Sequence, residues 1–503
     1  MNHRINRKDN MTLENETVTS YLSKSLFIRG LQCHKSLWLQ KNCPELKDEV
    51  SGEQEALFAT GFKVGDLAKE LFPRGVEVPY EGLTHNEQVE RTREAIDKGA
   101  DTIYEATFLH NCIFIKADIL YCGKQGWELY EVKASTEVKD YHYYDVALQY
   151  HVLRGSGFEP GKACIVHVNN SYVRKGDLNI RELFTIVDVT SEILDLQQRV
   201  SQEISSQRAM LLGDIPAIDI GPHCTAPYEC DFTGCCWDHI PEDSVFDLRG
   251  RGADKFALYR QGIVRQAEIP LEKLNNSQRF QVESTIMERD SIDKEGVRAF
   301  LDSLWHPLCF LDFETFMDPI PPFEGSWPYQ QIPFQFSLHI EREPESETEH
   351  HEFLGEPGRD PRRELLVFLL RLVPENACII AWNQPFEIRV LRGLADMFPQ
   401  YGKRIDQMID NFRDLMVPFR DRTVYLWRTK GSYSIKKVLP VLVPELTYEG
   451  LEIADGATAM DAWHVMNSLE NPDELASVRT AILAYCELDT LAMVRILEKL
   501  RNL

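Results

Sequence analysis

The chain has 503 residues, of which 43% are hydrophobic and 27% charged, and this composition excludes a largely disordered or fibrous protein. The formal net charge of −24 argues against a surface coated with basic groups for loose nucleic-acid binding. No apolar stretch approaches the roughly 18 residues of a membrane span, and residues 1–20 lack the apolar core of a secretory signal. We therefore expect a cytoplasmic protein with about three domains, or two large ones.

The first half of the chain is predicted to be a mixed α/β domain over residues 21–240, preceded by a polar, frayed segment over 1–20. Apolar periodicity and turn residues place helices and strands in alternation. The predicted helices cover 55–72, 143–154 and 190–211. The predicted strands lie within 102–135 and at 163–168 and 183–189. Gly123 and Gly126 predict a hairpin between the last two strands of the 102–135 group.

A charged segment over 241–300 has few chemical signals, and we expect a mostly helical connector there. A second α/β domain is predicted over 301–503, since apolar strands again alternate with helices. The predicted elements are strands at 308–316, 334–340 and 377–382 and a helix at 363–373. The glutamate-rich stretch 341–352 is expected to be a solvated hairpin tip.

The first group of candidate site residues lies in the first domain. Glu131 and Lys133 are two residues apart on a predicted strand, so both side chains face the same side. Asp118 ends the preceding strand and can meet Glu131 across the hairpin, where two carboxylates can hold Mg²⁺ or Mn²⁺. The lysine can stabilise charge that develops on a phosphate, and Gln149 on the next helix can add a contact. The alternative is a surface salt bridge.

Four cysteines bracket this group and form a second candidate site. They are Cys33, Cys224, Cys230 and Cys236, with Cys235 competing for the last place. Four thiolates, three of them clustered in sequence, are a ligand set for an iron–sulfur cluster or a zinc ion. A metal there would close a long loop and have a structural role. Buried thiols without a metal are the alternative.

Residues 21–240 resemble the RecB-like branch of the PD-(D/E)xK nucleases, which have a restriction-endonuclease-like fold. The chain is similar to the subgroup of CRISPR-adaptation exonucleases with one early cysteine, three late cysteines and a 4Fe–4S cluster. The resemblance assigns the D…ExK positions and the glutamine of the next helix to Asp118, Glu131, Lys133 and Gln149. It implies that Cys33, Cys224, Cys230 and Cys236 bind the cluster. Leu153 stands where the family has a tyrosine, and Glu70 is our candidate for the position of a metal-binding histidine.

A second set of acids lies in the second domain. Asp312 and Glu314 are two apart on a strand and share a face. Glu387 follows a buried strand at the start of a helix. Tyr485 and Asp489 are four apart on a predicted helix, so both face the same space. Four converging carboxylates repel one another unless divalent metals neutralise them, and two metals so held suit attack of water on a phosphodiester.

These five residues resemble the motifs of the DEDD exonucleases of the RNase H-like fold, in the subtype whose last motif is YxxxD. The resemblance implies metal binding by the four acids, positioning of water by the tyrosine, and 3′→5′ cleavage of single strands. Glu387 stands where that family has aspartate. The stretches PYQQIPFQFSLH, GSYSIKKVLP and YCELDT together resemble an uncharacterised bacterial family, domain of unknown function 2779, over most of 305–500.

Residues 401–440 form a locally basic segment, in which nine basic and four acidic side chains leave a balance of +5. Five aromatic residues are interleaved with them. A basic groove with stacking rings suits single-stranded nucleic acid, whereas the alternative is an ordinary surface of mixed charge. Together these patterns predict a nuclease of DNA or RNA ends that uses Mg²⁺ or Mn²⁺. A catalytically degenerate nucleic-acid-binding or scaffold protein in DNA repair or phage defence is the alternative, and the cysteines could instead form a zinc or redox site.

Overall fold

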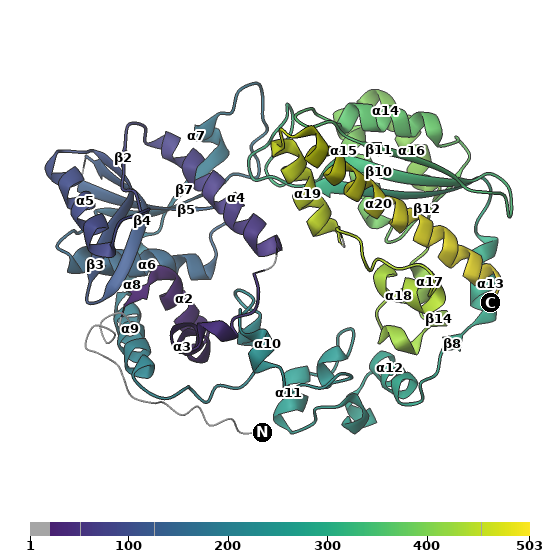
Figure 1. Ribbon diagram of the computed structural model, residues 1–503, viewed down its shortest axis with the longest axis horizontal. Helices are drawn as coiled ribbons and strands as arrows, with labels where there is room; N and C mark the ends of the chain where they lie inside the picture. Colours follow the sequence, from purple (N-terminus) through teal and green to yellow (C-terminus); the bar gives the residue numbers. More distant parts are fainter. Residues whose placement is uncertain (1–20, 51, 125, 454) are drawn as a thin grey trace. The chain divides into compact units, whose positions relative to one another are not determined.

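The computed structural model describes residues 21–50, 52–124, 126–453 and 455–503, so the segment 1–20 that was predicted to be frayed lies outside it. The described chain is mixed α/β, as predicted, with two large mixed sheets (Figure 1). Contacts divide it into two compact units. Unit 1 comprises the described residues up to His239 with Pro319–Pro328, and unit 2 comprises Ile240–Asp318 with Tyr329–Leu503. Within the described residues, no helix has both the length and the apolar character needed to cross a bilayer.

Unit 1 is built on a seven-stranded sheet in the order β2-β3-β4-β5-β6-β7, with β1 paired to β4. The strands are β1 Leu22–Ser23, β2 Val76–Glu77, β3 Thr102–His110, β4 Ile113–Gly123, β5 Gly126–Lys133, β6 Lys162–Val168 and β7 Phe184–Asp188. The predicted hairpin is present, because β4 and β5 pair antiparallel with Gly123 opposite Gly126. Asp118 was expected at the end of its strand but lies inside β4, since the strand continues through the buried residues Ile119 and Leu120 to Gly123.

Helices cover the sheet of unit 1 and enclose its core. They are α2 Lys24–Gln32, α3 His34–Asn42, α4 Gly52–Ala68, α5 His85–Asp97, α6 Asp140–Gly155, α7 Ile180–Leu183, α8 Thr190–Asp195, α9 Gln197–Leu211 and α10 Thr233–Cys236, with 3₁₀ turns η1 Pro44–Leu46, η2 Lys69–Leu71 and η3 Pro222–Cys224. Helix α6 contributes Val146 and Val152 to the apolar core, together with Ile115 of β4. The single helix expected over 190–211 is divided at Leu196 into α8 and α9.

The segment Pro319–Pro328 belongs to unit 1 although the chain on both sides of it belongs to unit 2. The guanidinium of Arg174 donates hydrogen bonds to the carbonyl oxygens of Pro321 at 3.1 Å and Pro322 at 2.7 Å. The backbone of Arg174 exchanges two further hydrogen bonds with Gly325 and Ser326, each 2.9 Å long. These contacts hold the segment as a backbone-paired loop on unit 1.

Unit 2 contains a five-stranded mixed sheet in the order β11-β10-β9-β12-β13. The strands are β9 Leu308–Phe316, β10 Ile332–Glu341, β11 Glu349–Leu354, β12 Cys378–Ala381 and β13 Phe412–Asp414. Strand β9 pairs antiparallel with β10 and parallel with β12. The glutamate-rich stretch is only partly a hairpin tip, because its last four residues form the start of β11.

The remaining elements of unit 2 pack against this sheet or lie in the segment that precedes it. They are α11 Lys255–Arg260, α12 Asn276–Ile286, α13 Lys294–Asp302, α14 Arg362–Leu372, α15 Pro385–Met397, α16 Gly402–Asp410, α17 Val417–Arg420, α18 Ile435–Leu442, α19 Gly456–Ser468, α20 Pro472–Arg501, 3₁₀ turns η4 Val245–Asp247, η5 Gln266–Glu268, η6 Leu271–Lys273, η7 Pro399–Tyr401 and η8 Trp427–Thr429, and strands β8 Ser291–Ile292 and β14 Val424–Tyr425. The predicted connector, 241–300, forms short helices with a small apolar cluster of its own that includes Val245, Leu258 and Val282.

One face of the central strand β9 changes from apolar to acidic along its length. Leu311 and Phe313 point into the core beneath α14, α15 and α16. On the other face, Phe310 packs in the cluster that includes residues of α18 and α20, and the next two positions on that face are Asp312 and Glu314. Helix α20 crosses this side of the sheet in contact with β9 and β10 (Figure 1). The acids therefore lie where a packed apolar face ends.

Candidate metal centres

Five residues predicted as a site in the second domain line one pocket of unit 2, with a volume of about 210 Å³, which we call the acid pocket. Strand β9 supplies two acids, the first turn of α15 supplies the third, and adjacent turns of α20 supply a tyrosine and the fourth acid. In that order they are Asp312, Glu314, Glu387, Tyr485 and Asp489. The structure thus brings together residues that are remote along the chain.

The carboxylates of the acid pocket are poorly solvated. Glu387 is 2% exposed, and Glu314 and Asp489 are each 8% exposed. Burial first, and then the charge of Asp489, raises the pKa of Asp312 well above its ordinary value. Burial and Asp312 likewise raise the pKa of both Glu314 and Glu387. Since buried like charges oppose one another, the pocket favours the binding of cations.

Three residues that line or adjoin the acid pocket were not predicted as site residues. The Tyr448 hydroxyl donates to Asp489 Oδ1 at 2.5 Å, and the Cys486 thiol lies 3.5 Å from Asp312 Oδ2. Ligand atoms of Asp312, Glu314 and Cys486 all lie within 4.8 Å of one another. The ammonium of Lys436 lies 5.4 Å from the centre of the Tyr485 ring. Cys486 is adjacent to Tyr485 in sequence, which could have signalled it, but nothing local signals Tyr448.

The residues predicted in unit 1 also come together. The Lys133 ammonium donates to Glu131 Oε1 at 2.8 Å, and the Gln149 amide donates to Glu131 Oε2 at 2.6 Å. Asp118 Oδ2 accepts a hydrogen bond of 2.7 Å from the backbone N–H of Val132, between the two predicted β5 residues. We call this group the β5 site.

The β5 site also contains two residues that the sequence analysis did not identify. The Lys24 ammonium, at the start of α2, donates to Glu131 Oε1 at 2.5 Å, and Lys133 also pairs with Asp145. Burial raises the pKa of Glu131, but the charges of Lys133 and Lys24 outweigh burial and hold this pKa below its usual range. Burial and the charge of Glu131 raise the pKa of Asp118 to about 7. Asp145 lies four residues before Gln149 on α6, a spacing that could have revealed it.

Other positions suggested by the family resemblance lie outside the β5 site. Leu153 and Tyr150 are both buried in the apolar core of unit 1. Glu70, the candidate for the histidine position, is exposed to solvent. Leu153 therefore has a packing role where the resembled family has a tyrosine.

The four predicted cysteines line a small enclosed cavity of about 20 Å³ in unit 1, which we call the cysteine cluster. Cys33 is the N-cap of α3, and the other three come from η3, the loop after it and α10. Ile218, Ile220 and Phe232 add apolar walls. Cys235 is exposed and does not line the cavity.

The chemistry of the cysteine cluster suits a metal group that prefers sulfur. Burial raises the pKa of the Cys33 thiol, while the backbone amides of Ser36 and Lys35 favour its thiolate. The Gly221 amide donates to Cys224 Sγ at 3.5 Å. Four thiols with amide donors beside them offer sulfur ligands of the kind that zinc and iron–sulfur clusters use.

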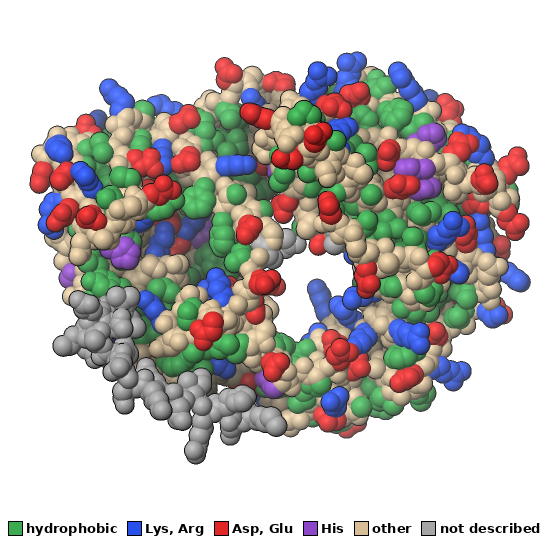
Figure 2. Space-filling model, viewed as in Figure 1, with side chains coloured by type: hydrophobic (Ala, Val, Ile, Leu, Met, Phe, Trp, Pro, Cys, Tyr) green, Lys and Arg blue, Asp and Glu red, His purple; other side chains and the backbone are tan. Residues whose placement is uncertain are grey.

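The basic segment 401–440 does not form one continuous groove. Arg413 lies over the ring of Trp305, Arg404 donates to the carbonyl of Val373, and Lys430 pairs with Asp243. On the face shown in Figure 2, basic side chains are frequent over the part of unit 2 where Figure 1 places α12, α17, α18 and β14.

Comparison with known proteins gives two similarities. Residues 309–434 match a family described as a domain of unknown function (DUF2779). The matched range contains Asp312, Glu314 and Glu387 and ends before Tyr485. The chain is also similar to the "Uncharacterized protein MG366 homolog" of Mycoplasma pneumoniae, with 24% identity over 229 residues. That match covers 41% of this chain and 34% of the relative's length.

Proposed function

We propose that unit 2 is a metal-dependent nuclease of the DEDD type with an RNase H-like fold. The observation that carries this proposal is the convergence of four carboxylates and one tyrosine in the acid pocket, where three of the carboxylates and the tyrosine are buried. Mg²⁺ or Mn²⁺ held by Asp312, Glu314, Glu387 and Asp489 would supply charge stabilisation for hydrolysis of a phosphodiester. The mixed sheet that presents the first two acids supports this assignment.

Three further side chains in or beside the acid pocket have roles in this proposal. Tyr485 lies one helical turn from Asp489, so its hydroxyl can orient a water molecule against the phosphorus atom. Tyr448 fixes Asp489 through a hydrogen bond. The ammonium of Lys436 attracts the phosphate to the pocket. The preference for 3′ ends of single strands rests on the motif resemblance, and DNA and RNA are both candidate substrates.

We further propose that unit 1 is a second nuclease module of the PD-(D/E)xK type. Asp118 and Glu131 would hold the metal, Lys133 would stabilise the developing charge, and Gln149 fixes the Glu131 carboxylate. The cysteine cluster would hold a 4Fe–4S cluster with a structural role, joining α3 to the segment 222–236.

The decisive experiment is cleavage of end-labelled single- and double-stranded DNA and RNA with Mg²⁺ or Mn²⁺. Asp312→Ala is expected to abolish the 3′→5′ products, whereas Asp396→Ala, a change of an exposed acid on α15, is expected to retain them. Lys133→Ala is expected to remove the cleavage that belongs to unit 1. Unchanged products after Asp312→Ala would refute the assignment of unit 2.

A second candidate function is a nucleic-acid-binding scaffold without catalysis. It is favoured by one observation in the β5 site, where two lysines and Gln149 satisfy the Glu131 carboxylate without a metal. Binding of nucleic acid without turnover in Mg²⁺ or Mn²⁺ would support this function over cleavage.

A further inference from the structure

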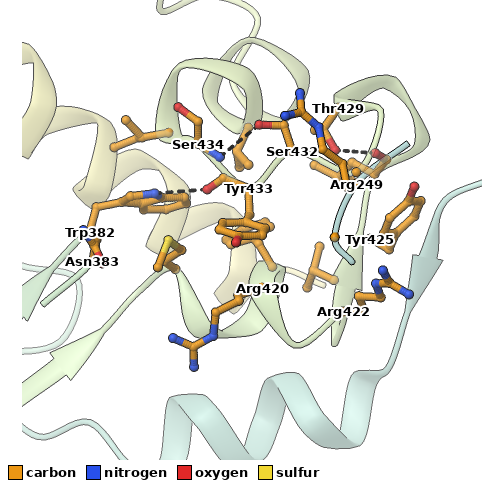
Figure 3. Close-up of a pocket in the computed structure, with 18 of the residues that line it drawn as sticks. Arg249, Trp382, Asn383, Arg420, Arg422, Tyr425, Thr429, Ser432, Tyr433 and Ser434 are labelled. Atoms are coloured by element: carbon orange, nitrogen blue, oxygen red, sulfur yellow. Dashed lines mark hydrogen bonds between the residues drawn. The ribbon is translucent and has the colours of Figure 1, made fainter. Parts of the chain in front are cut away.

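Unit 2 contains a second pocket, with a volume of about 830 Å³, whose lining is drawn in Figure 3. Trp382, Asn383 and Ile435 line both pockets, so the two share a wall. The larger pocket is bounded by the chain around α17, β14 and η8 and by residues near 249–250. We call it the arginine pocket.

Charge distinguishes the arginine pocket from the rest of the chain. Arg249, Arg420 and Arg422 line it, and no carboxylate does, although the whole protein has a net charge of −24. Arg420 reaches Asp421 at 3.0 Å and remains 42% exposed. Arg422 is held over the rings of Phe280 and Tyr425. Guanidinium groups grouped in this way fit phosphate oxygens.

Aromatic surface is available beside these charges. Tyr433 is 44% exposed, and its backbone carbonyl accepts a hydrogen bond of 3.2 Å from the indole of Trp382. Figure 3 shows the labelled Tyr433 ring among the lining residues, with Trp382 and Arg420 nearby. An exposed ring next to arginines is suited to stacking on a nucleobase.

One wall of the arginine pocket contains a buried polar group. Tyr425 is 4% exposed and lines the arginine pocket, yet its hydroxyl has no hydrogen-bond partner among the residues that the structure describes. A buried hydroxyl without a partner is costly, so this wall of the pocket is less stably packed than the rest of the core.

We propose that the arginine pocket binds nucleotides of a single-stranded substrate that adjoin the phosphodiester in the acid pocket. Arg420 and Arg249 contact backbone phosphates, and Tyr433 stacks on a base. This inference rests on the proposed function of unit 2, and it names the strand on one side of the scissile bond as the substrate part that unit 2 recognises.

The test measures binding of labelled single-stranded DNA and RNA by fluorescence anisotropy in EDTA, where metal-dependent cleavage cannot occur. Tyr433→Ala is expected to weaken binding by about 5- to 100-fold through the lost stacking. Arg420→Gln is expected to weaken it and to reduce the slope of log K against log salt by about 0.7. Arg428→Gln, a change of a nearby exposed arginine outside the pocket, is expected to retain both affinity and slope.

An abasic substrate separates stacking from a general structural effect. Wild-type protein is expected to bind more weakly when one base that reaches the pocket is removed, whereas Tyr433→Ala is expected to be insensitive to that removal. The proposal would be overturned if Tyr433→Ala and Arg420→Gln both bound with the affinity and the salt slope of the wild type. Tight binding of a free mononucleotide that oligonucleotides fail to displace would overturn it as well.

The two proposals fail in different ways. If Asp312→Ala retains the 3′→5′ products, the function of unit 2 is wrong whatever the arginine pocket binds. If Asp312→Ala abolishes the 3′→5′ products but Arg420→Gln and Tyr433→Ala form them and bind as the wild type does, the nuclease assignment stands and the pocket assignment is overturned. If Arg420→Gln and Tyr433→Ala raise KM and retain kcat, both the nuclease assignment and the pocket assignment are supported.

Discussion

At the scale of single residues, Glu387 is the most informative member of the acid pocket. It is 2% exposed, and its Oε2 atom has no hydrogen-bond partner among the described residues. Because burial and the charge of Asp312 oppose its ionisation, Glu387→Gln is expected to raise the free energy of unfolding of the metal-free protein by about 1 kcal/mol. The measurement is urea unfolding in EDTA at neutral pH.

When metal is present, Glu387→Gln is expected to lower the free energy of unfolding relative to the wild type. Mn²⁺ is expected to stabilise the wild type by about 2.7 kcal/mol at a hundredfold excess over its Kd, and Glu387→Gln is expected to lose most of this gain. Glu364→Gln, a change of an exposed residue on α14, serves as the control and should leave both values unchanged. A Glu387→Gln protein that is less stable without metal and still stabilised by Mn²⁺ would contradict this account of the pocket.

His339 predicts a pH dependence of stability. Burial, then the charges of His350, Arg495 and His351, lowers its pKa from the ordinary 6.5 to about 4. Between these values the unfolded chain binds a proton that the folded protein does not, so stability falls as the pH decreases from about 6.5 to 4. The loss attributable to this group approaches roughly 3 kcal/mol.

Urea unfolding at pH 7 and pH 5 measures this effect. His339→Gln is expected to lose less stability on acidification than the wild type does, because the variant no longer excludes a proton. His85→Gln is the control, since that imidazole is exposed in the folded protein. Equal pH slopes for the wild type and His339→Gln would show that this histidine does not set the dependence.

At the scale of elements, spacing within one strand or helix was sufficient to predict several contacts. Glu131 and Lys133 share a face of β5, and Tyr485 and Asp489 share a face of α20, because strand and helix periodicity fix these directions. Contacts between elements had no such signal. Lys24 reaches Glu131 across 107 residues, and Tyr448 precedes its partner by 41.

Sequence patterns also did not predict where some elements end or where a small segment packs on itself. The helix over 190–211 is interrupted at Leu196 although its apolar periodicity continues, because periodicity reports a buried face and not the hydrogen bonding of each turn. The segment 241–300 was interpreted as a connector, yet a few apolar residues spaced far apart suffice to form a cluster there.

The cysteine cluster joins two elements and predicts a property of unit 1. Cys33→Ser is expected to remove iron, sulfide and the broad absorbance near about 400 nm from anaerobically purified protein. The unfolding midpoint of unit 1 should fall by about 5 °C or more, since each 1 kcal/mol corresponds to about 2–4 °C in a unit of this size. Cys122→Ser and Cys235→Ser alter exposed cysteines outside the cavity and should retain the colour. A colourless wild type that contains zinc would refute the iron–sulfur assignment.

At the scale of the whole molecule, each unit has apolar clusters of its own, which predicts two thermal transitions in calorimetry. Ile115→Ala in unit 1 and Ile379→Ala in unit 2 each remove a side chain that is 1% exposed. Each variant is expected to lose about 2–5 kcal/mol and to lower one transition only. A single transition that both variants lower equally would show that the chain unfolds as one cooperative body.

The loop Pro319–Pro328 gives the chain an unusual route, because the polypeptide leaves unit 2 after Asp318, joins unit 1, and returns at Tyr329. The two units are consequently linked by three peptide crossings and not by one. A protease that hydrolyses the bond after His239 would leave two fragments still tethered by the loop that Arg174 holds. For the same reason, a fragment expressed from Ile240 onward would lack Arg174, so the loop Pro319–Pro328 would lose the hydrogen bonds that hold it.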